Sequence, residues 1–591
     1  MKRIVCLVLA LLCIVPLVAY GMVSDAAGTA LEAVKTKAEL QQFAESSEVF
    51  HGITAEERAE IIEIVEAWYA EYLVMKDEDL SQYQTSYKTQ DSNEYAKAYY
   101  ANTQYAQFID PKYKAGNLRP TRTVESLEGW LESEYFEKEY ELDVYGGWEN
   151  HSFGEIEATG NFYVKKLGNR WYYINPLGNP CINIGVVGPL HSYNANTQQE
   201  AAALEIYGSV EKWAVYTVNH LKHEDGFNLV MHWAPDGDMV LGVPEGMVYQ
   251  QSTSPMTEYG RTLDIVSQSG NTSFDGGAIP IFDPAFPEFA KTYLEQTVAP
   301  YLNDKRVVGF TTDNEFPMHR EMVANYLTLD PVTTPAHRYS YAAAWTWYYK
   351  MTGIQSYGEM TKAEIETATK PYWDLFRGFV YYRYFSVLAP IMEEVAPDHM
   401  YGGHRFFTPD STATVLDSEW IIRFAGKYCD YICLNWYRRY WTLTPELAAN
   451  LTKWSGDKPF LITEFYAKSD LFEGEGDSRD VDSQDQGGGW HVDGSGQLNG
   501  VDTQVGTAHR ARADYYENST LAFLEWGNIV GWHWYRYNHY WLGSGTTLRS
   551  AGGIVNDDHV PYPEFEEAFQ QINKHVYGLA EFFDERKENN N

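Results

Sequence analysis

The stretch VVGFTTDNE (residues 307–315) begins with apolar residues and ends with Asn314 and Glu315. A short apolar run of this kind is typical of a buried strand. A strand that ends in an Asn-Glu pair delivers a carboxylate to the loop that follows. The stretch therefore predicts a buried strand with a chemically useful carboxylate at its carboxyl end, and its meaning depends on whether other strands end in the same way.

Seven other short runs share this form. They are CINIGVV (181–187), FNLVMHW (227–233), AIPIFD (278–283), MYGGHRF (400–406), YICLNWY (431–437), PFLITEF (459–465) and VGWHWYR (530–536). Periodic stretches typical of helices lie between them, at 285–301, 371–396, 445–455 and 506–527. Eight strands alternating with helices predict an α/β fold, a (β/α)8 TIM barrel over residues 181–578. A doubly wound sheet is disfavoured, because no Gly-x-Gly-x-x-Gly turn follows the first strand.

Nearly every run is apolar at its start and polar or aromatic at its end. In a TIM barrel, the carboxyl ends of the strands open onto the active face. We therefore expect one face of the barrel to carry His232, Asp283, Asn314, Glu315, His404, Arg405, Asn435, Tyr437, Glu464 and Trp534.

Two of these residues, Glu315 and Glu464, end the fourth and the seventh expected strands. These strands face each other across a closed barrel, so both carboxylates are expected to flank one bound sugar. Such a pair suits glycoside hydrolysis, in which one group protonates the leaving oxygen and the other attacks the anomeric carbon or activates water. A separation of about 5–5.5 Å implies retention of configuration and a wider one implies inversion. The sequence alone leaves this choice open.

The other polar strand ends suggest supporting roles around the two glutamates. Tyr437 is expected to donate a hydrogen bond to Glu464, and Arg405 to keep a nearby glutamate ionised. His404 is expected either to bind substrate hydroxyls or to orient the carboxylates. Asn314 is expected to bind the hydroxyl next to the anomeric centre, and Trp534 to stack under the sugar ring. Position alone makes His232, Asp283 and Asn435 substrate-binding candidates.

Composition limits the class of partner. The 591 residues contain 45 Lys and Arg against 82 Asp and Glu, for a net charge of −37. So acidic a surface repels nucleic-acid phosphates and anionic lipids, so we expect neither nucleic acid nor membrane as a partner. A neutral polysaccharide or oligosaccharide is the easier substrate. Aromatic residues make up 15% of the chain, which fits either large buried cores or sugar stacking.

The amino-terminal part divides into three segments. Residues 1–21 have a basic start, an apolar run and a small-x-small end, which predicts a secretory signal peptide and a secreted protein. Residues 30–145 read as a mainly helical accessory region, with a capping box at Thr54–Glu57 and an apolar helix face at Ile61, Val65, Trp68 and Tyr72. Residues 146–180 are rich in aromatic runs and turns, which predicts a short β segment before the barrel.

No cofactor is expected, and no metal is assigned to the site. Cys181, Cys429 and Cys433 remain after the signal peptide, and we interpret them as small buried core residues. The Gly- and Asp-rich stretch 468–505 has a composition that suits calcium but lacks EF-hand spacing. It is therefore interpreted as a long loop after the seventh strand.

The ordered set of motifs resembles a known family. Asn-Glu after strand four and Glu after strand seven resemble the clan A retaining glycoside hydrolases. Together with the stretch from 158 to 188, YGGHRFF, KPFLITEF, VGWHWYRY and GGIVNDDHVPYPEF, they resemble the β-agarases of glycoside hydrolase family 50 over roughly residues 145–575. The resemblance implies that Glu315 is the acid/base, that Glu464 is the nucleophile, and that the substrate is a β-linked galactan such as agarose.

Two departures keep alternatives open. The helical amino-terminal region does not resemble the β-sandwich module expected in that family, and stretch 468–505 is longer than expected. Loops on this face set substrate choice, so another β-glycan hydrolase, of the β-galactosidase, mannanase or glucanase type, is an alternative. A non-catalytic polysaccharide-binding barrel is a third reading, which the presence of both glutamates disfavours.

Overall fold

The computed structural model describes most of the chain between residues 34 and 589. The described residues are 34–85, 87, 123–192, 196–232, 238–244, 246–266, 273–408, 414–437, 443–469, 491–492, 505–538, 540–541, 549–550 and 552–589. They fall into two compact units. Unit 1 comprises residues 1–78, 256–289 and 317–384, and unit 2 comprises residues 79–255, 290–316 and 385–591. The expected signal peptide lies outside the described residues.

Unit 1 is helical. Its helices are α2 (Lys37–Ser46), α3 (Ala55–Lys76), α8 (Pro255–Thr262), the start of α9 (Phe286–Val298), α10 (Met322–Leu327), α11 (Arg338–Thr352), α12 (Lys362–Thr369) and the first half of α13 (Trp373–Val395). The predicted capping box is confirmed, since Thr54 and Glu57 exchange hydrogen bonds at the start of α3. The predicted apolar face of α3 is also buried. Its Trp68 packs against Trp347 and Phe379, which places an aromatic core between α3, α11 and α13.

Unit 2 contains the parallel sheet on which the site is built. Its strands are β4 (Asn183–Val187), β5 (Leu229–His232), β6 (Val248–Thr253), β7 (Val307–Thr312), β8 (Met400–Tyr401), β9 (Arg405–Phe407), β10 (Ile432–Asn435), β11 (Phe460–Phe465) and β14 (Ile529–Trp534). Their order is β8-β7-β6-β5-β4-β14-β11-β10-β9. The outermost two strands in this order, β8 and β9, come from one short stretch of chain. Parallel pairing also links Asn314, just after β7, to Arg405 in β9.

The remaining strands of unit 2 form small sheets. An antiparallel sheet of β1 (Tyr163–Leu167), β2 (Arg170–Ile174) and β3 (Pro180–Cys181) forms where the sequence predicts a short β segment. Four two-residue strands form two further pairs: β12 (Lys468–Ser469) with β13 (His491–Val492), and β15 (Tyr540–Trp541) with β16 (Arg549–Ser550).

One predicted strand is wrong, and another was missed. Residues 278–283 form no strand; they follow a short 3₁₀ turn and lead into α9. Pro280 lies in the middle of this run, and a proline removes a backbone donor that a central strand needs. The strand between β5 and β7 is instead β6, whose sequence VYQQST is mostly polar. Its Gln250 is buried because it donates to the Gly309 carbonyl and accepts from the Tyr431 hydroxyl.

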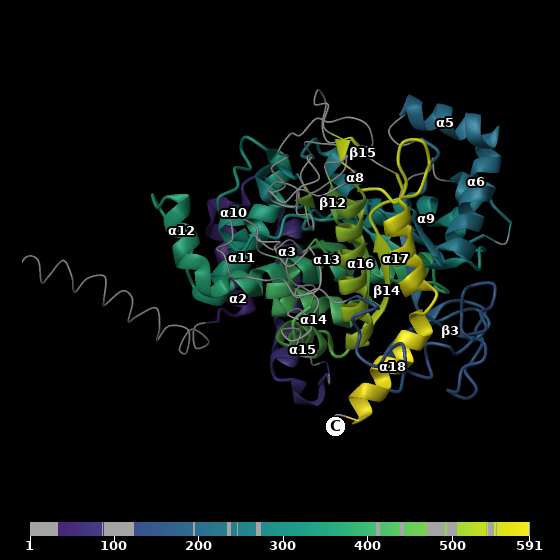
Figure 1. The fold of residues 1–591 in the computed structure, drawn as a ribbon. Helices are drawn as coiled ribbons and strands as arrows, with labels where there is room; N and C mark the ends of the chain where they lie inside the picture. The colour runs from purple at the N-terminus through teal and green to yellow at the C-terminus, as the bar shows by residue number, and fades with distance from the viewer. Residues whose placement is uncertain are drawn as a thin grey trace, which may run out of the picture. The chain divides into compact units, whose positions relative to one another are not determined.

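Helices pack along the sheet of unit 2. They are α5 (Thr197–Tyr207), α6 (Val210–Asn219), α7 (Asp238–Leu241), α14 (Glu419–Tyr428), α15 (Pro445–Ser455), α16 (Val505–Trp526), α17 (Pro563–Asn573) and α18 (Val576–Asn589). The helical periods predicted for 445–455 and 506–527 are confirmed by α15 and α16. Figure 1 shows α16 and α17 side by side next to β14.

The apolar core of the sheet lies toward the amino ends of its strands. Leu229, Val248, Val308, Cys433, Leu461 and Val530 belong to one buried cluster. Cys181, Cys429 and Cys433 are free and buried, which confirms their interpretation as core residues. Because apolar side chains fill this end, polar groups gather where the strands finish.

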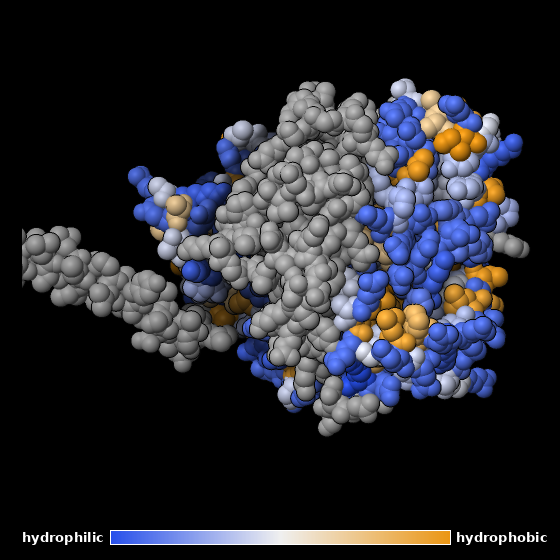
Figure 2. All heavy atoms as spheres, in the orientation of Figure 1, coloured by the Kyte–Doolittle hydropathy of each residue, from blue (hydrophilic) through white to orange (hydrophobic). Residues whose placement is uncertain are grey.

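Part of the surface of unit 2 is apolar. Exposed apolar side chains occur on α5 and α6, at Leu204, Ile206, Val215 and Tyr216. Orange patches lie over these two helices in Figure 2, among mostly hydrophilic residues. Within the described ranges, every helix is too short or too polar to cross a membrane.

Candidate active site

The turn after β7 has an unusual backbone. Asp313 and Glu315 both have positive φ angles, 54° and 53°. Left-handed backbone is uncommon for residues other than glycine, and it persists where neighbours hold it in place. Here the Asp313 N–H donates to the Thr253 carbonyl at 2.6 Å, and the Glu315 N–H donates to the Arg405 carbonyl at 2.9 Å. The neighbouring strands thus fix the direction of the Glu315 side chain.

Glu464 lies near the end of β11 and is 6% exposed. Arg405 Nη1 donates to its Oε1 at 2.7 Å, and the Tyr437 hydroxyl donates to its Oε2. Burial raises the pKa of the Glu464 carboxyl above its usual value, although Arg405, Tyr437 and Arg536 act to lower it. The carboxylate is therefore held by two donors, and its charge is balanced by nearby guanidinium groups.

Asn435 links the two glutamates. Its Nδ2 donates to Glu315 Oε1 at 2.7 Å and to Asn314 Oδ1 at 2.9 Å. Its backbone is paired with Glu464 in the register of β10 and β11. Its Oδ1 accepts from the Thr463 hydroxyl at 2.7 Å, so the amide cannot flip without losing bonds on both sides.

Both glutamates lie close enough to Tyr437 to affect the pKa of its hydroxyl. Burial raises the pKa of its hydroxyl well above the usual value, and the charges of Glu464 and Glu315 raise it further. Both carboxylates therefore act on the same phenol. The structure brings together Asn314, Glu315, Arg405, Asn435, Tyr437 and Glu464, all in unit 2.

His404 lies beneath the turn that carries Glu315. Its side chain is fully buried, and its Nε2 accepts a hydrogen bond from the Phe316 N–H at 3.2 Å. The ring stacks on Phe316 with centroids 4.5 Å apart. Burial lowers the pKa of His404 well below its usual value, so the ring is neutral. Of the two expected roles, the geometry matches orientation of the turn rather than contact with substrate.

Trp534 is not where the sequence analysis expects it. The side chain is fully buried and packs on Phe465, Tyr516 and Phe565, and its indole N–H donates to the Gly552 carbonyl at 3.2 Å. The reason is strand alternation, because successive side chains point to opposite faces. Its neighbour His533 points to the opposite face, close enough to Arg405 for the arginine charge to lower its pKa.

Asp283 and His232 are the remaining candidates. Asp283 follows the run that forms no strand and lies in unit 1, where its Oδ1 accepts from the Ala285 N–H at 3.0 Å just before α9. This corrects its placement at a strand end. The backbone of His232 ends β5, but its side chain lies outside the described residues, as does Trp233.

Sequence reasoning assigned no role to two charged or titratable neighbours of the site. Arg536 is fully buried, and its charge lowers the pKa of Glu464. His533 is also fully buried, and burial together with the Arg405 charge lowers its pKa to about 3. The eighth apolar run already ended in Arg536, so the rule that strand ends carry the site was sufficient to find it.

Comparisons with known proteins identify similar chains. No family model matches. A curated protein named β-agarase B, from Vibrio sp. (strain JT0107), is 24% identical over 442 residues, which cover 66% of this chain. The alignment spans 38% of the length of that relative.

Solved structures also resemble this one. A protein named BpGH50 is 22% identical with a TM-score of 0.57, covering 80% of this chain and 91% of that one. The agarase AgWH50C is 16% identical with a TM-score of 0.53, covering 85% and 71%. An exo-β-agarase is 16% identical with a TM-score of 0.54, covering 80% and 72%. These likenesses show that the chain shares the fold of these solved structures.

Proposed function

We propose that this protein is a secreted glycoside hydrolase that cleaves β-linked, agarose-like galactan with retention of configuration. The main support is a shared set of contacts around the two glutamates. Arg405 and Tyr437 donate hydrogen bonds to Glu464. Glu315 accepts from Asn435 and donates its N–H to the Arg405 carbonyl. We also propose that the nine strands close into a (β/α)8 barrel, with residues 400–407 serving as one strand. Support comes from the pairing of Asn314 with Arg405 and from the bond between the Glu315 N–H and the Arg405 carbonyl.

Glu464 is assigned as the nucleophile. Its carboxylate attacks the anomeric carbon, and a covalent glycosyl-enzyme forms as the leaving oxygen departs. Attack requires the ionised form, and Arg405 and Tyr437 donate hydrogen bonds that stabilise it. These donors also orient the carboxylate, which reduces the freedom that it must lose at the transition state.

Glu315 is assigned as the acid/base. It protonates the leaving oxygen in the first step and then takes a proton from the water that hydrolyses the intermediate. Asn435 donates to its Oε1 and so helps to orient the carboxyl group. Asn314, in contact with the same amide, is assigned to the sugar hydroxyl next to the anomeric centre.

The agarose-like substrate rests on the similarity to β-agarase B and on charge. The chain carries a net charge of −37, and agarose is a neutral polymer that such a surface does not repel. Another β-glycan, of the β-galactoside, mannan or glucan class, is the alternative, because the same two glutamates serve any of them. A non-catalytic binding role has no use for a buried pair of carboxylates with matched donors.

A substrate panel tests the activity and the sugar together. Purified protein is incubated with agarose, porphyran, mannan and β-glucan, and the release of reducing ends is measured. Hydrolysis of agarose above the others supports the proposal, and hydrolysis of mannan or glucan alone selects the alternative. No hydrolysis of any polymer would remove the enzymatic proposal.

The mechanism is tested by Glu464→Ala with added azide. Activity should fall by about 10⁴-fold or more, because the covalent route is lost, and azide should partly restore it as a glycosyl azide of inverted configuration. Glu517→Ala is the matched control, since Glu517 is a similarly buried glutamate on α16 that accepts the Val124 N–H. Secretion is tested separately, by sequencing the amino terminus of protein recovered from the culture medium.

A further inference from the structure

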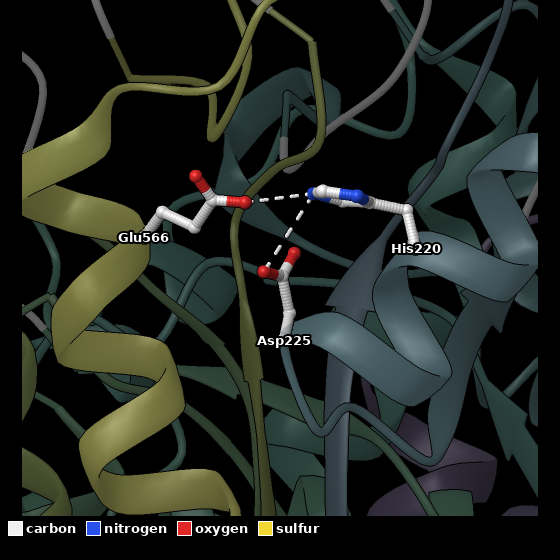
Figure 3. Close-up of side chains that lie close together, drawn as sticks. All are labelled: His220, Asp225 and Glu566. Carbon is white, nitrogen blue, oxygen red and sulfur yellow. Dashed lines mark hydrogen bonds and ion pairs between the residues drawn. The ribbon is translucent and has the colours of Figure 1, made fainter.

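A second cluster of titratable side chains lies in unit 2, outside the candidate active site. It consists of His220, the first residue of a π-helical turn (His220–Glu224) after α6, with Asp225 just beyond that turn and Glu566 on α17. One nitrogen or oxygen atom from each residue lies within 4.8 Å of the others. Figure 3 shows the three side chains pointing toward one another from two separate helical segments.

One carboxylate oxygen of the cluster has no hydrogen-bond partner among the described residues. His220 Nε2 lies 2.8 Å from Glu566 Oε1 and 3.8 Å from Asp225 Oδ1. The second distance is too long for a hydrogen bond. Asp225 is 2% exposed, and its Oδ1 has no hydrogen-bond partner among the described residues. A buried carboxylate oxygen without a partner is costly, so this atom indicates that a positive ligand or a proton completes the cluster.

A small, partly open pocket borders the cluster. Its described lining includes Thr217, Tyr537, Val555 and His559 beside the three clustered residues, and it contains no Lys or Arg. Burial lowers the pKa of His559, and its ring donates to or accepts from neighbouring groups, so it supplies no charge. Two carboxylates therefore face a pocket in which no lysine or arginine balances them.

We propose that His220, Asp225 and Glu566 form a binding site for a divalent transition-metal ion, with Zn²⁺ as the expected metal. One imidazole nitrogen and two carboxylate oxygens are ligands that Zn²⁺ accepts, at about 2.0–2.2 Å. Calcium and magnesium are disfavoured, since they prefer oxygen ligands alone. Ligands around a tetrahedral ion at these bond lengths lie about 3.3 Å apart, within the range that this cluster already shows.

The surroundings hold the ligands in place. The His220 ring stacks on Tyr216 with centroids 5.7 Å apart, and Asn573 on α17 donates to the Asp225 carbonyl at 2.9 Å. His220 and Glu566 are partly exposed, so a water molecule would serve as the fourth ligand of the bound ion. The ion would tie the end of α6 to α17, and binding to the folded state alone would stabilise the fold. This inference is independent of the proposed hydrolase activity.

A proton is the competing occupant. Burial, opposed by His220 and reinforced by Glu566, raises the pKa of the Asp225 carboxyl to about 7. In that case the three residues form a hydrogen-bonded cluster and bind no metal. The two occupants differ in whether the protein takes up one equivalent of metal at this place.

The test uses the full-length protein after treatment with EDTA. Zn²⁺ binding is measured by calorimetry, Co²⁺ binding by the visible absorption of a tetrahedral cobalt complex, and stability by the melting temperature with and without Zn²⁺. We expect one ion per chain and a higher melting temperature with Zn²⁺. Glu566→Gln and Asp225→Asn should each weaken binding at least 10-fold, and Glu567→Gln, an exposed neighbour on the same helix, should leave it unchanged.

Two results would overturn the proposal. One is the absence of stoichiometric Zn²⁺ or Co²⁺ binding, which would assign the cluster to a proton. The other is binding that persists at full strength in Glu566→Gln, which would place the ion elsewhere, for example in the Gly- and Asp-rich stretch 468–505. Glu566 is partly exposed and Gln keeps its shape, so this variant decides the question even if Asp225→Asn fails to fold.

Discussion

Arg405 donates from Nη1 to the Glu464 carboxylate at 2.7 Å, and both side chains are buried. The backbone carbonyl of the same arginine accepts the N–H of Glu315. One residue of β9 therefore contacts both glutamates, through its side chain on one and its main chain on the other. Arg405 therefore balances the charge of Glu464 with its side chain and helps to position Glu315 with its main chain.

The first prediction concerns the pH dependence of activity. Burial raises the pKa of Glu464, and Arg405 is the largest of the groups that lower it. The nucleophile must be ionised, so the acidic limb of the kcat/KM profile should lie above the usual pKa of 4.5. Arg405→Gln removes the opposing charge, and the limb should move to higher pH. The measurement is kcat/KM on a soluble oligosaccharide across pH.

Arg423→Gln is the control for this change. Arg423 is buried on α14 and pairs with Glu419 on the same helix. Its replacement should leave the acidic limb in place. If the acidic limb of the kcat/KM profile also keeps its position in Arg405→Gln, a group other than Glu464 determines that limb.

The second prediction concerns stability. A carboxyl whose pKa is raised on folding binds its proton more tightly in the folded state than in the unfolded chain. Between the unfolded and folded pKa values the folded state holds more protons, so the free energy of unfolding falls as the pH rises through that window. Glu464→Gln abolishes this loss. Its melting temperature relative to the wild type should therefore increase as the pH rises from about 4.5, and then level off.

The wild type and Glu464→Gln are compared by thermal unfolding at a series of pH values. The slope of the difference is the informative quantity, since Gln changes packing equally at every pH. A difference that is constant with pH would show that Glu464 has the same pKa in both states.

The third prediction concerns Asn435. Asn435→Ala removes the donor to Glu315 and Asn314 and leaves the Thr463 hydroxyl without its acceptor. Activity should fall by about 10²-fold or more, because a misplaced acid/base loses the proximity that orientation provides. Stability should fall by about 1–3 kcal/mol. Steady-state kinetics and denaturant unfolding give the two values.

Asn528→Ala provides the comparison. Asn528 is similarly buried just before β14 and donates to Asp457 at 2.9 Å. It should lose comparable stability while kcat remains near the wild-type value. Equal losses of activity in both variants would reduce the role of Asn435 to packing.

The strand pattern was predictable wherever apolar residues dominate. Seven of the eight expected runs contain strands of the parallel sheet, because Val, Ile and Leu suit strands buried on both faces. The strand β6 was not predicted, because polar residues such as Gln250 and Gln251 usually indicate an exposed segment. Their burial depends on partners such as the Tyr431 hydroxyl, which is 181 residues away along the chain.

The site was predictable in position and in part in its contacts, since the Tyr437 hydroxyl donates to Glu464 as expected. The rule that strand ends carry chemistry located Glu315, Glu464, Asn435 and Tyr437. The contact of Arg405 with Glu464 depends on the sheet order β9-β10-β11, which no single strand encodes. Which of two neighbouring side chains faces the site is also undetermined until the register is known, and this is why Trp534 was assigned to the sugar although it is buried in the core.

The fourth prediction follows from the position of Trp534. The side chain is fully buried among Phe465, Tyr516 and Phe565. Trp534→Ala should cost about 3–5 kcal/mol of unfolding free energy, because it leaves a large cavity. Trp534→Phe keeps most of the packing but loses the bond to the Gly552 carbonyl, so it should cost less and leave KM within about 2-fold of wild type. A sugar platform would behave in the opposite way, with stability nearly unchanged in Trp534→Phe and KM strongly raised. Denaturant unfolding of both variants, together with KM for an oligosaccharide, separates a core residue from a binding one.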